Sequence, residues 1–316
     1  MRVGIIGAGG IARKMAKTIN GMESTQLYAI ASRSLEKAKA FATEFAVEKA
    51  YGSYEEMVRD KNVDLVYVAT PHSHHHQHCL LALEHGKHVL CEKAFTFNEA
   101  QAAEVIAFAK EKHLLVAEAI WTRYLPMRHM LDEVIASGII GEVRSLTANL
   151  GYVINHVPRL ADPELAGGAL LDLGVYTINF MLMVLGNDYE RFDSTVTMTD
   201  TGVDAQNSMT FIYPEGKMAI LHTTQLASTD RRGMIFGTKG YIEVTNINNP
   251  EWIRVFDTEH VLLKEIKQPQ QITGFEYQVE ACRTAISADA IECPEMPHQE
   301  ILRVMRIMDL IRSQWK

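Results

Sequence analysis

The first 120 residues alternate short, almost wholly apolar runs with segments in which apolar residues recur at helical spacing. Apolar runs of this length, separated by helical segments, are typical of a parallel sheet that is covered on both faces. We therefore predict a doubly wound α/β domain, a Rossmann fold, over residues 1–121. Its predicted strands are residues 3–6, 27–31, 64–69, 88–91 and 114–119.

After Trp121 the pattern changes to an amphipathic helix, a long strand, a very apolar helix and then a series of strand-like runs. Turn signals such as Pro214-Glu215-Gly216 separate these runs, and consecutive strands with short turns form antiparallel sheets. We predict an α+β domain over residues 122–316 with a large, open, mostly antiparallel sheet, whose uncovered face serves association between copies. The last helix is expected to remain in this domain or to pack back on the first. The predicted elements are helices 126–136, 170–184, 275–287 and 298–312, and strands 143–153, 192–198, 208–213, 218–224, 233–236, 241–244 and 253–256.

Charge excludes two classes of partner. The 316-residue chain has a formal net charge of −8, and no block of Lys or Arg interrupts that acidic balance. Nucleic acids and anionic membranes attract positively charged proteins, so we expect neither as a partner. The very apolar segment 169–186 contains Asp172, Tyr176 and Asn179, which favours a buried helix over a membrane span.

The cysteines favour a reducing compartment. The four are widely spaced and form no Cys-x-x-Cys pair: Cys79, Cys91, Cys282 and Cys293. Disulfide scaffolds and zinc ribbons depend on paired spacings, so we expect reduced thiols. The apolar run after Met1 is also too short for a signal peptide, and we expect a cytoplasmic protein.

A glycine-rich turn joins the first predicted strand to the first predicted helix. It reads Gly7-Ala8-Gly9-Gly10-Ile11-Ala12, a GxGxxA pattern. The first glycine permits a tight turn, the second lets a pyrophosphate approach the backbone, and Ala12 allows close packing of helix and strand. Since free N–H groups at a helix start bind anions, we predict that Gly7, Gly9, Gly10, Ile11 and Ala12 bind a dinucleotide.

The end of the second strand indicates which dinucleotide binds. NAD enzymes usually carry a carboxylate there, but this chain has Ser32-Arg33 and no carboxylate until Glu36. A hydroxyl and a guanidinium suit a 2′-phosphate, so we predict NADP(H), held by Ser32, Arg33 and Lys37, with NAD as the alternative. In the competing interpretation Arg33 is a solvated loop residue that stacks on adenine and accepts either cofactor.

Five imidazoles follow the fourth strand, within residues 72–78. Histidines four residues apart on a helix can chelate a metal. No carboxylate or thiol lies among them, and each pair would need further ligands from elsewhere, so we expect no metal site. We place Thr70, His72 and His75 at the cofactor and the other histidines in solvent.

Glu92 and Lys93 end the fifth strand, at the edge where open α/β sheets bind ligands. We predict that both contact the cofactor and that Lys93 is catalytic, because a lysine there lies near the nicotinamide, whose positive charge discourages the ammonium form. The alternative is a Lys93 that pairs with Glu92 or a helix end.

Three further positions suit a small polar substrate. Asp172 and Tyr176, spaced i and i+4 in an apolar helix, share one face and are predicted to be catalytic. Trp121 and Arg123 offer an aromatic floor and a fixed cation, and with Tyr176 they are predicted to bind substrate. Structural alternatives are a hydrogen-bonded Asp172–Tyr176 pair and a domain-packing role for Trp121 and Arg123.

Together these motifs resemble the Gfo/Idh/MocA (glucose–fructose oxidoreductase/inositol dehydrogenase) family over essentially the whole chain. Residues 118–126 look most like its dimeric dihydrodiol dehydrogenase branch, in which Tyr ends the motif that Asp172 begins here. Two positions depart from the family pattern: Ala94 replaces the proline of Glu-Lys-Pro, and His72 replaces an asparagine. The other matching pieces are residues 7–12, Thr70-Pro71 with His75, 86–93 and 168–176.

The resemblance implies hydride transfer between NADP(H) and a secondary hydroxyl or carbonyl of a sugar, polyol or cyclic trans-dihydrodiol. It also implies a homodimer or larger homo-oligomer joined through the sheet. Either Tyr176 or Lys93 takes the proton, with Asp172 as an orienting group. Two other classes stay open: a non-catalytic dinucleotide- or sugar-binding regulator of the same fold, and a metal-dependent hydrolase built on the histidines.

Overall fold

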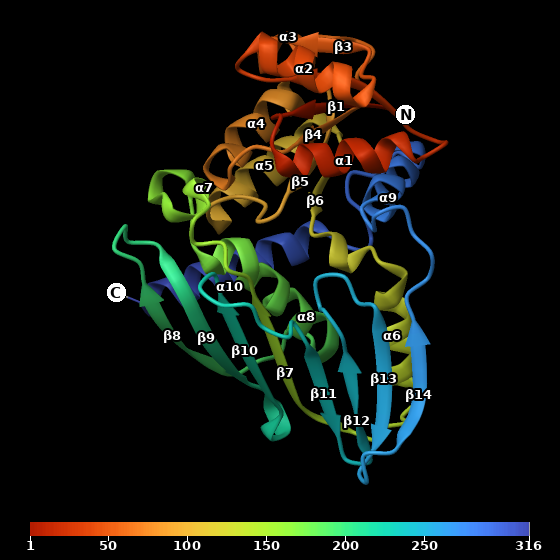
Figure 1. Ribbon diagram of the computed structural model, residues 1–316, viewed down its shortest axis with the longest axis vertical. Helices are drawn as coiled ribbons and strands as arrows, with labels where there is room; N and C mark the ends of the chain where they lie inside the picture. Colours follow the sequence, from red (N-terminus) through yellow and green to blue (C-terminus); the bar gives the residue numbers. More distant parts are fainter. Residues whose placement is uncertain (316) are drawn as a thin grey trace. The chain divides into compact units, whose positions relative to one another are not determined.

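A computed structural model describes residues Met1–Trp315 (Figure 1). The chain forms two compact units. The first comprises Met1–Tyr124 and Gln271–Met305, and the second comprises Leu125–Gln270 and the segment from Arg306 onward. The first unit therefore takes in a segment, Gln271–Met305, that lies beyond the predicted boundary at residue 121.

The first unit contains a six-stranded parallel sheet with strand order β3-β2-β1-β4-β5-β6. This is the predicted Rossmann fold, and its central strands are buried because nearly every residue in them is apolar. The short strand β3 escaped sequence prediction. The strands are β1 Arg2–Ile6, β2 Gln26–Ala31, β3 Lys49–Tyr51, β4 Leu65–Val68, β5 His88–Glu92 and β6 Val116–Ala119.

Side chains define where several helices of this unit begin. Ser34, Ser53 and Asn98 each accept a hydrogen bond from a backbone N–H three residues on, as N-cap residues do. The helices are α1 Gly10–Asn20, α2 Leu35–Phe45, α3 Tyr54–Val58, α4 His72–Glu84, α5 Glu99–Lys112 and α9 Glu276–Ser287, with the short η1 Trp121–Arg123 and the first part of α10 His298–Ser313.

The second unit contains an eight-stranded sheet with strand order β14-β13-β12-β11-β7-β10-β9-β8. The pair β7–β10 is parallel and the other neighbours are antiparallel, so the sheet is mixed but mostly antiparallel, as predicted. The edge strand β14 was not predicted, because its sequence Leu-Leu-Lys-Glu-Ile-Lys does not alternate. The strands are β7 Val143–Gly151, β8 Arg191–Met198, β9 Asp204–Ile212, β10 Met218–Thr224, β11 Gly233–Gly237, β12 Gly240–Val244, β13 Trp252–Asp257 and β14 Leu262–Lys267.

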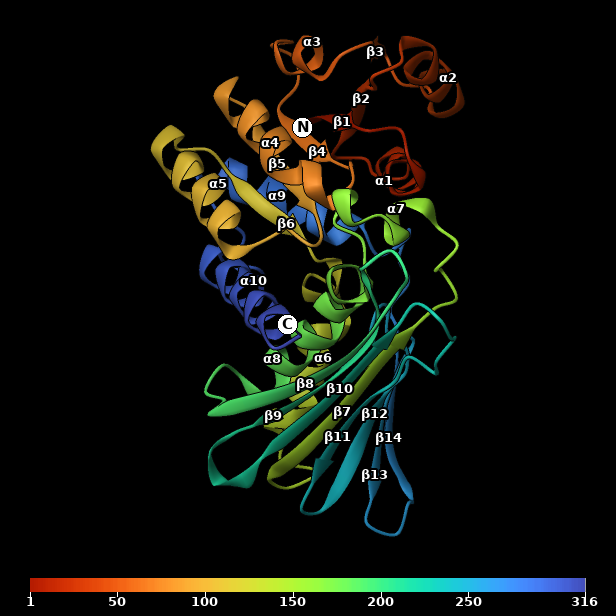
Figure 2. The same cartoon turned by 90° about the vertical axis from the view of Figure 1, so that its left-hand side faces the viewer.

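Helices cover one face of this sheet. Figures 1 and 2 show α6 (Pro126–Ala136) and α8 (Val175–Leu185) on the same side, and α8 packs on β7 and β10. Among the residues of this unit up to Trp315, no helix lies on the opposite face. Shorter helical segments are α7 Pro158–Ala161, η2 Pro163–Leu165, the π-helical η3 Leu170–Gly174 and η4 Pro214–Gly216.

Among residues 1–315, one stretch is long and apolar enough, by length and composition, to cross a membrane: Pro163–Leu185. In the structure, 83% of its most apolar window is buried, which is the environment of a core helix. This agrees with the buried helix predicted from Asp172, Tyr176 and Asn179.

Candidate functional site

The glycine turn has the geometry that a pyrophosphate needs. Gly7 has φ +98°, and a Cβ there would lie 2.7 Å from the carbonyl oxygen of Ala69, so no side chain fits. A Cβ on Gly9 or Gly10 would meet nothing within 4 Å, which leaves open space above the turn. Helix α1 starts at Gly10 without a side-chain cap and without an acidic residue in its first turn. Its first N–H groups therefore suit a bound anion.

Two exposed cations follow β2, one just after the strand and one in the first turn of α2. Arg33 and Lys37 are exposed, and neither forms an ion pair or side-chain hydrogen bond with any residue in 1–315. Ser32 is buried, and its hydroxyl accepts the N–H of Ser34 at 3.4 Å. The nearby carboxylate of Glu36 accepts a hydrogen bond from the Ser34 hydroxyl at 2.8 Å. This side of the fold fits a phosphate better than a neutral ribose hydroxyl.

The histidines of α4 divide between core and surface. His72, His75 and His78 are buried, whereas His76 bonds Glu104 at 2.9 Å on the surface. His78 was expected in solvent, but the residue is only 7% exposed, and its Nδ1 lies 3.0 Å from the Thr70 hydroxyl. Within residues 1–315, no three His, Cys, Asp or Glu side chains are grouped to hold a metal.

His75 is a core residue of α4. It is fully buried, with Nε2 2.8 Å from the carbonyl oxygen of Thr70 and Nδ1 2.9 Å from that of Ala94. Burial lowers the pKa of His75 to about 4, so the ring is neutral at physiological pH and donates to one carbonyl at a time. Both ring nitrogens therefore face backbone carbonyls, through which His75 positions Thr70 and Ala94, and its contact with the cofactor stays a prediction.

Lys93 lies directly after β5, in a segment held by its neighbours. Its N–H donates to Oε2 of Glu92 at 3.3 Å, and the hydroxyl of Tyr67 donates to Oε1 of the same carboxylate. Glu92 is only 5% exposed, so it anchors the strand end rather than pointing into solvent. The Lys93–Ala94 peptide bond is cis.

Trp121 packs in an aromatic cluster that sequence reasoning missed. Its ring stacks on Phe275 at 4.3 Å, and the Lys14 ammonium lies 4.7 Å and 4.4 Å from these two ring centroids. Burial lowers the pKa of Lys14, and the negative charge of Glu92 opposes that shift. Phe275 follows Trp121 by more than 150 residues, so no local pattern signalled the pair.

Arg123 takes the packing role that the sequence left open. It is 8% exposed, and Nη2 donates to Oε2 of Glu300 at 3.1 Å. Burial lowers its pKa to about 10, although the Glu118 carboxylate favours the charged form. Arg123 thus forms a buried ion pair inside the first unit, as the packing alternative expects, and its contact with substrate stays a prediction.

In the second unit, Asp172 lies within the π-helical segment η3, and Tyr176 lies in the first turn of α8. Both are largely buried, at 6% and 8% exposure. The predicted i, i+4 spacing assumed a regular α-helix, but residues Leu170–Gly174 are π-helical. Such segments are frequent at functional sites. Asp172 accepts two hydrogen bonds from the half-exposed Arg159, each at 3.3 Å.

Asp204 anchors the start of this helix. Its Oδ2 accepts the N–H of Leu170 at 2.6 Å and the side-chain amide of Asn207 at 2.9 Å. Gly168, with φ +107°, gives the carboxylate room, because a Cβ there would lie 2.1 Å from Oδ1. Burial raises the pKa of Asp204 to about 6, despite the opposing effect of these hydrogen bonds.

Comparisons with known proteins agree with this architecture. Residues 1–119 match the family described as oxidoreductase family, NAD-binding Rossmann fold, and residues 129–243 match the GFO/IDH/MocA C-terminal domain. Trans-1,2-dihydrobenzene-1,2-diol dehydrogenase of Xenopus tropicalis is 34% identical, covering 97% of this chain and 95% of its own. The mouse protein of that name is 36% identical, covering 88% and 82%.

Solved structures show the same fold. A 3-ketoreductase from Actinomadura kijaniata, in complex with NADP and TDP-benzene, has a TM-score of 0.91 and 26% identity. The match covers 99% of this chain and 97% of that one. An aldose-aldose oxidoreductase from Caulobacter crescentus, at 21% identity and a TM-score of 0.89, supports the fold alone. The chain belongs to the Gfo/Idh/MocA family and is an NAD(P)-dependent oxidoreductase.

Proposed function

We propose that this protein transfers a hydride between NADP(H) and a secondary hydroxyl or carbonyl of a sugar, a polyol or a cyclic trans-dihydrodiol. The observation that carries the proposal is the combination, in one unit, of an uncapped glycine turn with Lys93 at the carboxyl end of β5. The names of the relatives support the substrate class: dihydrodiol dehydrogenases by sequence and an NADP-bound ketoreductase by structure. The reduced cysteines fit a cytoplasmic location, which we retain as part of the proposal.

The preference for NADP over NAD rests on Arg33 and Lys37. Both cations are exposed and have no partner among residues 1–315: Arg33 follows the end of β2, where NAD enzymes carry a carboxylate, and Lys37 lies in the first turn of α2. A 2′-phosphate would compensate both charges, and Ser32 would add a hydroxyl. NAD lacks that phosphate and would leave the two cations solvated.

The chemistry needs one hydride acceptor and one proton acceptor. When bound, the nicotinamide ring would supply the hydride acceptor. For the second, we propose Tyr176 in its phenolate form, whose oxygen accepts the hydroxyl proton of the substrate as the C–O bond becomes a carbonyl. A phenol has an ordinary pKa of about 10, so it needs a nearby positive charge to act at neutral pH.

We assign that charge to Lys93, which also orients the substrate oxygen. Asp172 fixes the substrate through hydrogen bonds without changing its own protonation. In the alternative assignment Lys93 itself takes the proton, and Tyr176 only positions the oxygen. Kinetics of the single and double variants tests whether Lys93 and Tyr176 act together.

We further propose that the protein is a homodimer or larger homo-oligomer through the open face of the eight-stranded sheet. Ile220, in the centre of the sheet, is 46% exposed on that face. Tyr241 stacks on Phe256 at 4.9 Å, and Phe236 lies 6.3 Å from Tyr241. A broad sheet face with apolar and aromatic residues is stabilised when a second copy covers it.

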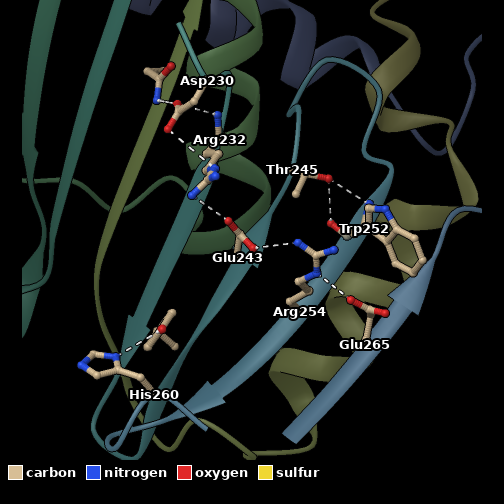
Figure 3. A network of polar contacts seen from close by, with 10 residues as sticks. Asp230, Arg232, Glu243, Thr245, Trp252, Arg254, His260 and Glu265 are labelled. Carbon is tan, nitrogen blue, oxygen red and sulfur yellow. Dashed lines mark hydrogen bonds and ion pairs between the residues drawn. The ribbon is translucent and has the colours of Figure 1, made fainter. Parts of the chain in front are cut away.

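A row of alternating charges crosses the same face (Figure 3). Glu243 bonds Arg232 at 2.9 Å and lies 3.6 Å from Arg254, and Arg254 bonds Glu265 at 2.6 Å. The ion pairs hold each side chain in place, and Glu243 is only 7% exposed. A two-fold related copy can oppose such a row with complementary charges, as a self-complementary interface requires.

A substrate screen tests the proposed function. Purified protein is mixed with sugars, inositols or trans-dihydrodiols and either NADP or NAD, and reduced cofactor is followed by its absorbance. We expect turnover on at least one of these classes, with NADP preferred. Tight cofactor binding without turnover on any of them would favour a non-catalytic regulator of the same fold.

A further inference from the structure

Glu118 is a buried carboxyl group beside the segment that carries Lys93. It lies on β6, directly opposite Cys91 of β5 in the parallel register, and is 0% exposed. Burying a carboxyl group without a partner destabilises the folded state, so a buried Glu118 indicates a structural or functional role.

One oxygen of Glu118 has a defined partner. Oε1 accepts the N–H of Phe95 at 3.0 Å, two residues after Lys93. The same short segment is held at two other points: the carbonyl oxygen of Ala94 lies 2.9 Å from Nδ1 of His75, and the thiol of Cys91 donates to the carbonyl of Phe95 at 3.5 Å. We call these three contacts to residues 94–95, from Glu118, His75 and Cys91, the clamp. Glu118 is the group in the clamp that accepts a backbone N–H.

The second oxygen is different. Oε2 of Glu118 is buried and has no hydrogen-bond partner among residues 1–315. Charged groups nevertheless surround the carboxyl group: Lys93 and Glu92 at the end of β5, and Arg123 of η1. The neighbouring Cys91 and Tyr124 are neutral donors, and the Tyr124 hydroxyl bonds the backbone carbonyl of Glu118 at 2.9 Å.

We propose that Glu118 is a positioning residue for Lys93. Its carboxyl group fixes the Ala94–Phe95 segment, and its negative charge, when ionised, acts on the lysine. The proposal rests on the proposed function in one respect, because it takes Lys93 as a catalytic residue. It extends that function to a residue on a neighbouring strand, more than 20 positions along the chain.

The protonation state of Glu118 fits this role. Burial raises its pKa to about 7, while the Phe95 N–H and the positive charges of Arg123 and Lys93 oppose the shift and Glu92 reinforces it. The group therefore gains a negative charge as pH rises through neutrality. A carboxylate accepts a stronger hydrogen bond from Phe95 than a carboxylic acid does, so the clamp tightens over the same range.

Two variants separate the acceptor from the charge. Glu118→Gln keeps an oxygen for the Phe95 N–H but cannot ionise, and Glu118→Ala removes both. Glu111→Gln, on the exposed surface of α5, is the matched control. Each full-length protein is assayed for hydrogen exchange over residues 93–97, NADPH binding by fluorescence, and kcat and KM across pH.

We expect Glu118→Ala to speed exchange of the Phe95 amide about fivefold or more, since one hydrogen bond is lost. We expect its kcat to fall about tenfold to a hundredfold through misplacement of Lys93, with NADPH affinity within about threefold of wild type. Glu118→Gln should keep the exchange protection. Its kcat should approach that of wild type below neutral pH, and the ratio of wild-type to variant kcat should rise as pH increases through 7.

Unchanged exchange and kcat in Glu118→Ala would overturn the proposal, and so would a wild-type to Glu118→Gln ratio that is independent of pH. If Glu118→Ala does not fold, the pH dependence of Glu118→Gln decides. If the wild type shows no turnover at all, the proposed function fails. The exchange measurement then tests separately whether Glu118 holds the segment.

Discussion

Arg159 places both terminal nitrogens of its guanidinium group 3.3 Å from a single oxygen of Asp172. Asp172 is buried in the π-helical segment before α8, while Arg159 is half-exposed on α7. An exposed side chain from a separate short helix thus orients a buried carboxylate at the predicted active site. Nothing in the local sequence around either residue indicated this pair.

Replacing Arg159 should therefore affect catalysis more than stability. An ion pair with one half-exposed partner contributes about 1 kcal/mol or less to folding, so Arg159→Met should leave the melting temperature nearly unchanged. Loss of the orienting contact should lower kcat/KM about three- to tenfold, and Arg159→Lys should recover part of it. A kcat/KM for Arg159→Met equal to that of wild type would show that Asp172 does not need this contact.

Removing Arg33 should weaken NADP binding selectively. Loss of one charge-assisted contact to a phosphate costs about 1.5–3 kcal/mol, which is about tenfold to a hundredfold in affinity. We expect Arg33→Ala to lose that factor for NADP and to bind NAD as wild type does. Lys39→Ala, an exposed lysine on the helix α2 that follows Arg33, is the control. Equal weakening for both cofactors would assign Arg33 to the adenine instead of the 2′-phosphate.

Variants at Tyr176 and Lys93 distinguish the two proton acceptors. Loss of a main acid/base group costs about a hundredfold to ten-thousandfold in rate, so Tyr176→Phe should fall in that range if Tyr176 takes the proton. Lys93→Met should turn over slowly in both assignments and still bind cofactor. If Tyr176→Phe stays within about threefold of wild type, Lys93 is the base.

Asp204 predicts a particular dependence of stability on pH. Burial raises its pKa from 3.8 to about 6, so the folded state holds this proton more tightly than the unfolded state. The resulting stabilisation is fully present below pH 3.8 and is lost as pH rises through 6. As pH rises from 3.8 to 6, the melting temperature of the wild type should therefore fall relative to that of Asp204→Asn. A difference that is constant with pH would mean that Asp204 titrates normally.

The open sheet face predicts a variant that separates the subunits. Ile220→Lys places a charge in the centre of that face, and burying an unpaired charge opposes association. We expect light scattering to show an oligomer for wild type and monomers for this variant at the same concentration. Leu310→Lys, equally exposed on α10 in the same unit, is the control and should remain oligomeric. A monomeric wild type would refute association through the sheet.

The sequence predicted the parts of the fold that depend on backbone constraints and on the spacing of nearby apolar residues. The glycine turn, the apolar strands of the first unit and the mostly antiparallel second sheet follow from backbone constraints and periodicity. Strands β3 and β14 escaped because one is very short and the other is an exposed edge with no alternation.

The site was less predictable, because its side chains are held by residues distant in sequence. The Asp204 carboxylate reaches Leu170 across 34 positions, and Trp121 packs on Phe275 across a larger interval. His75 and Arg123 were assigned to ligands from residue type, and their contacts with backbone carbonyls and with Glu300 could not be predicted from the local sequence. Glu118 looked like any strand residue until its burial and its bond to Phe95 were known.

Isotope transfer tests the central claim most directly. NADPH carrying deuterium on the transferred position of the nicotinamide ring is incubated with the protein and the ketone form of the substrate that gave turnover. The account predicts a product with one deuterium bound to the carbon of the new hydroxyl group, detected by mass spectrometry. A reduced product without deuterium at that carbon would contradict direct hydride transfer.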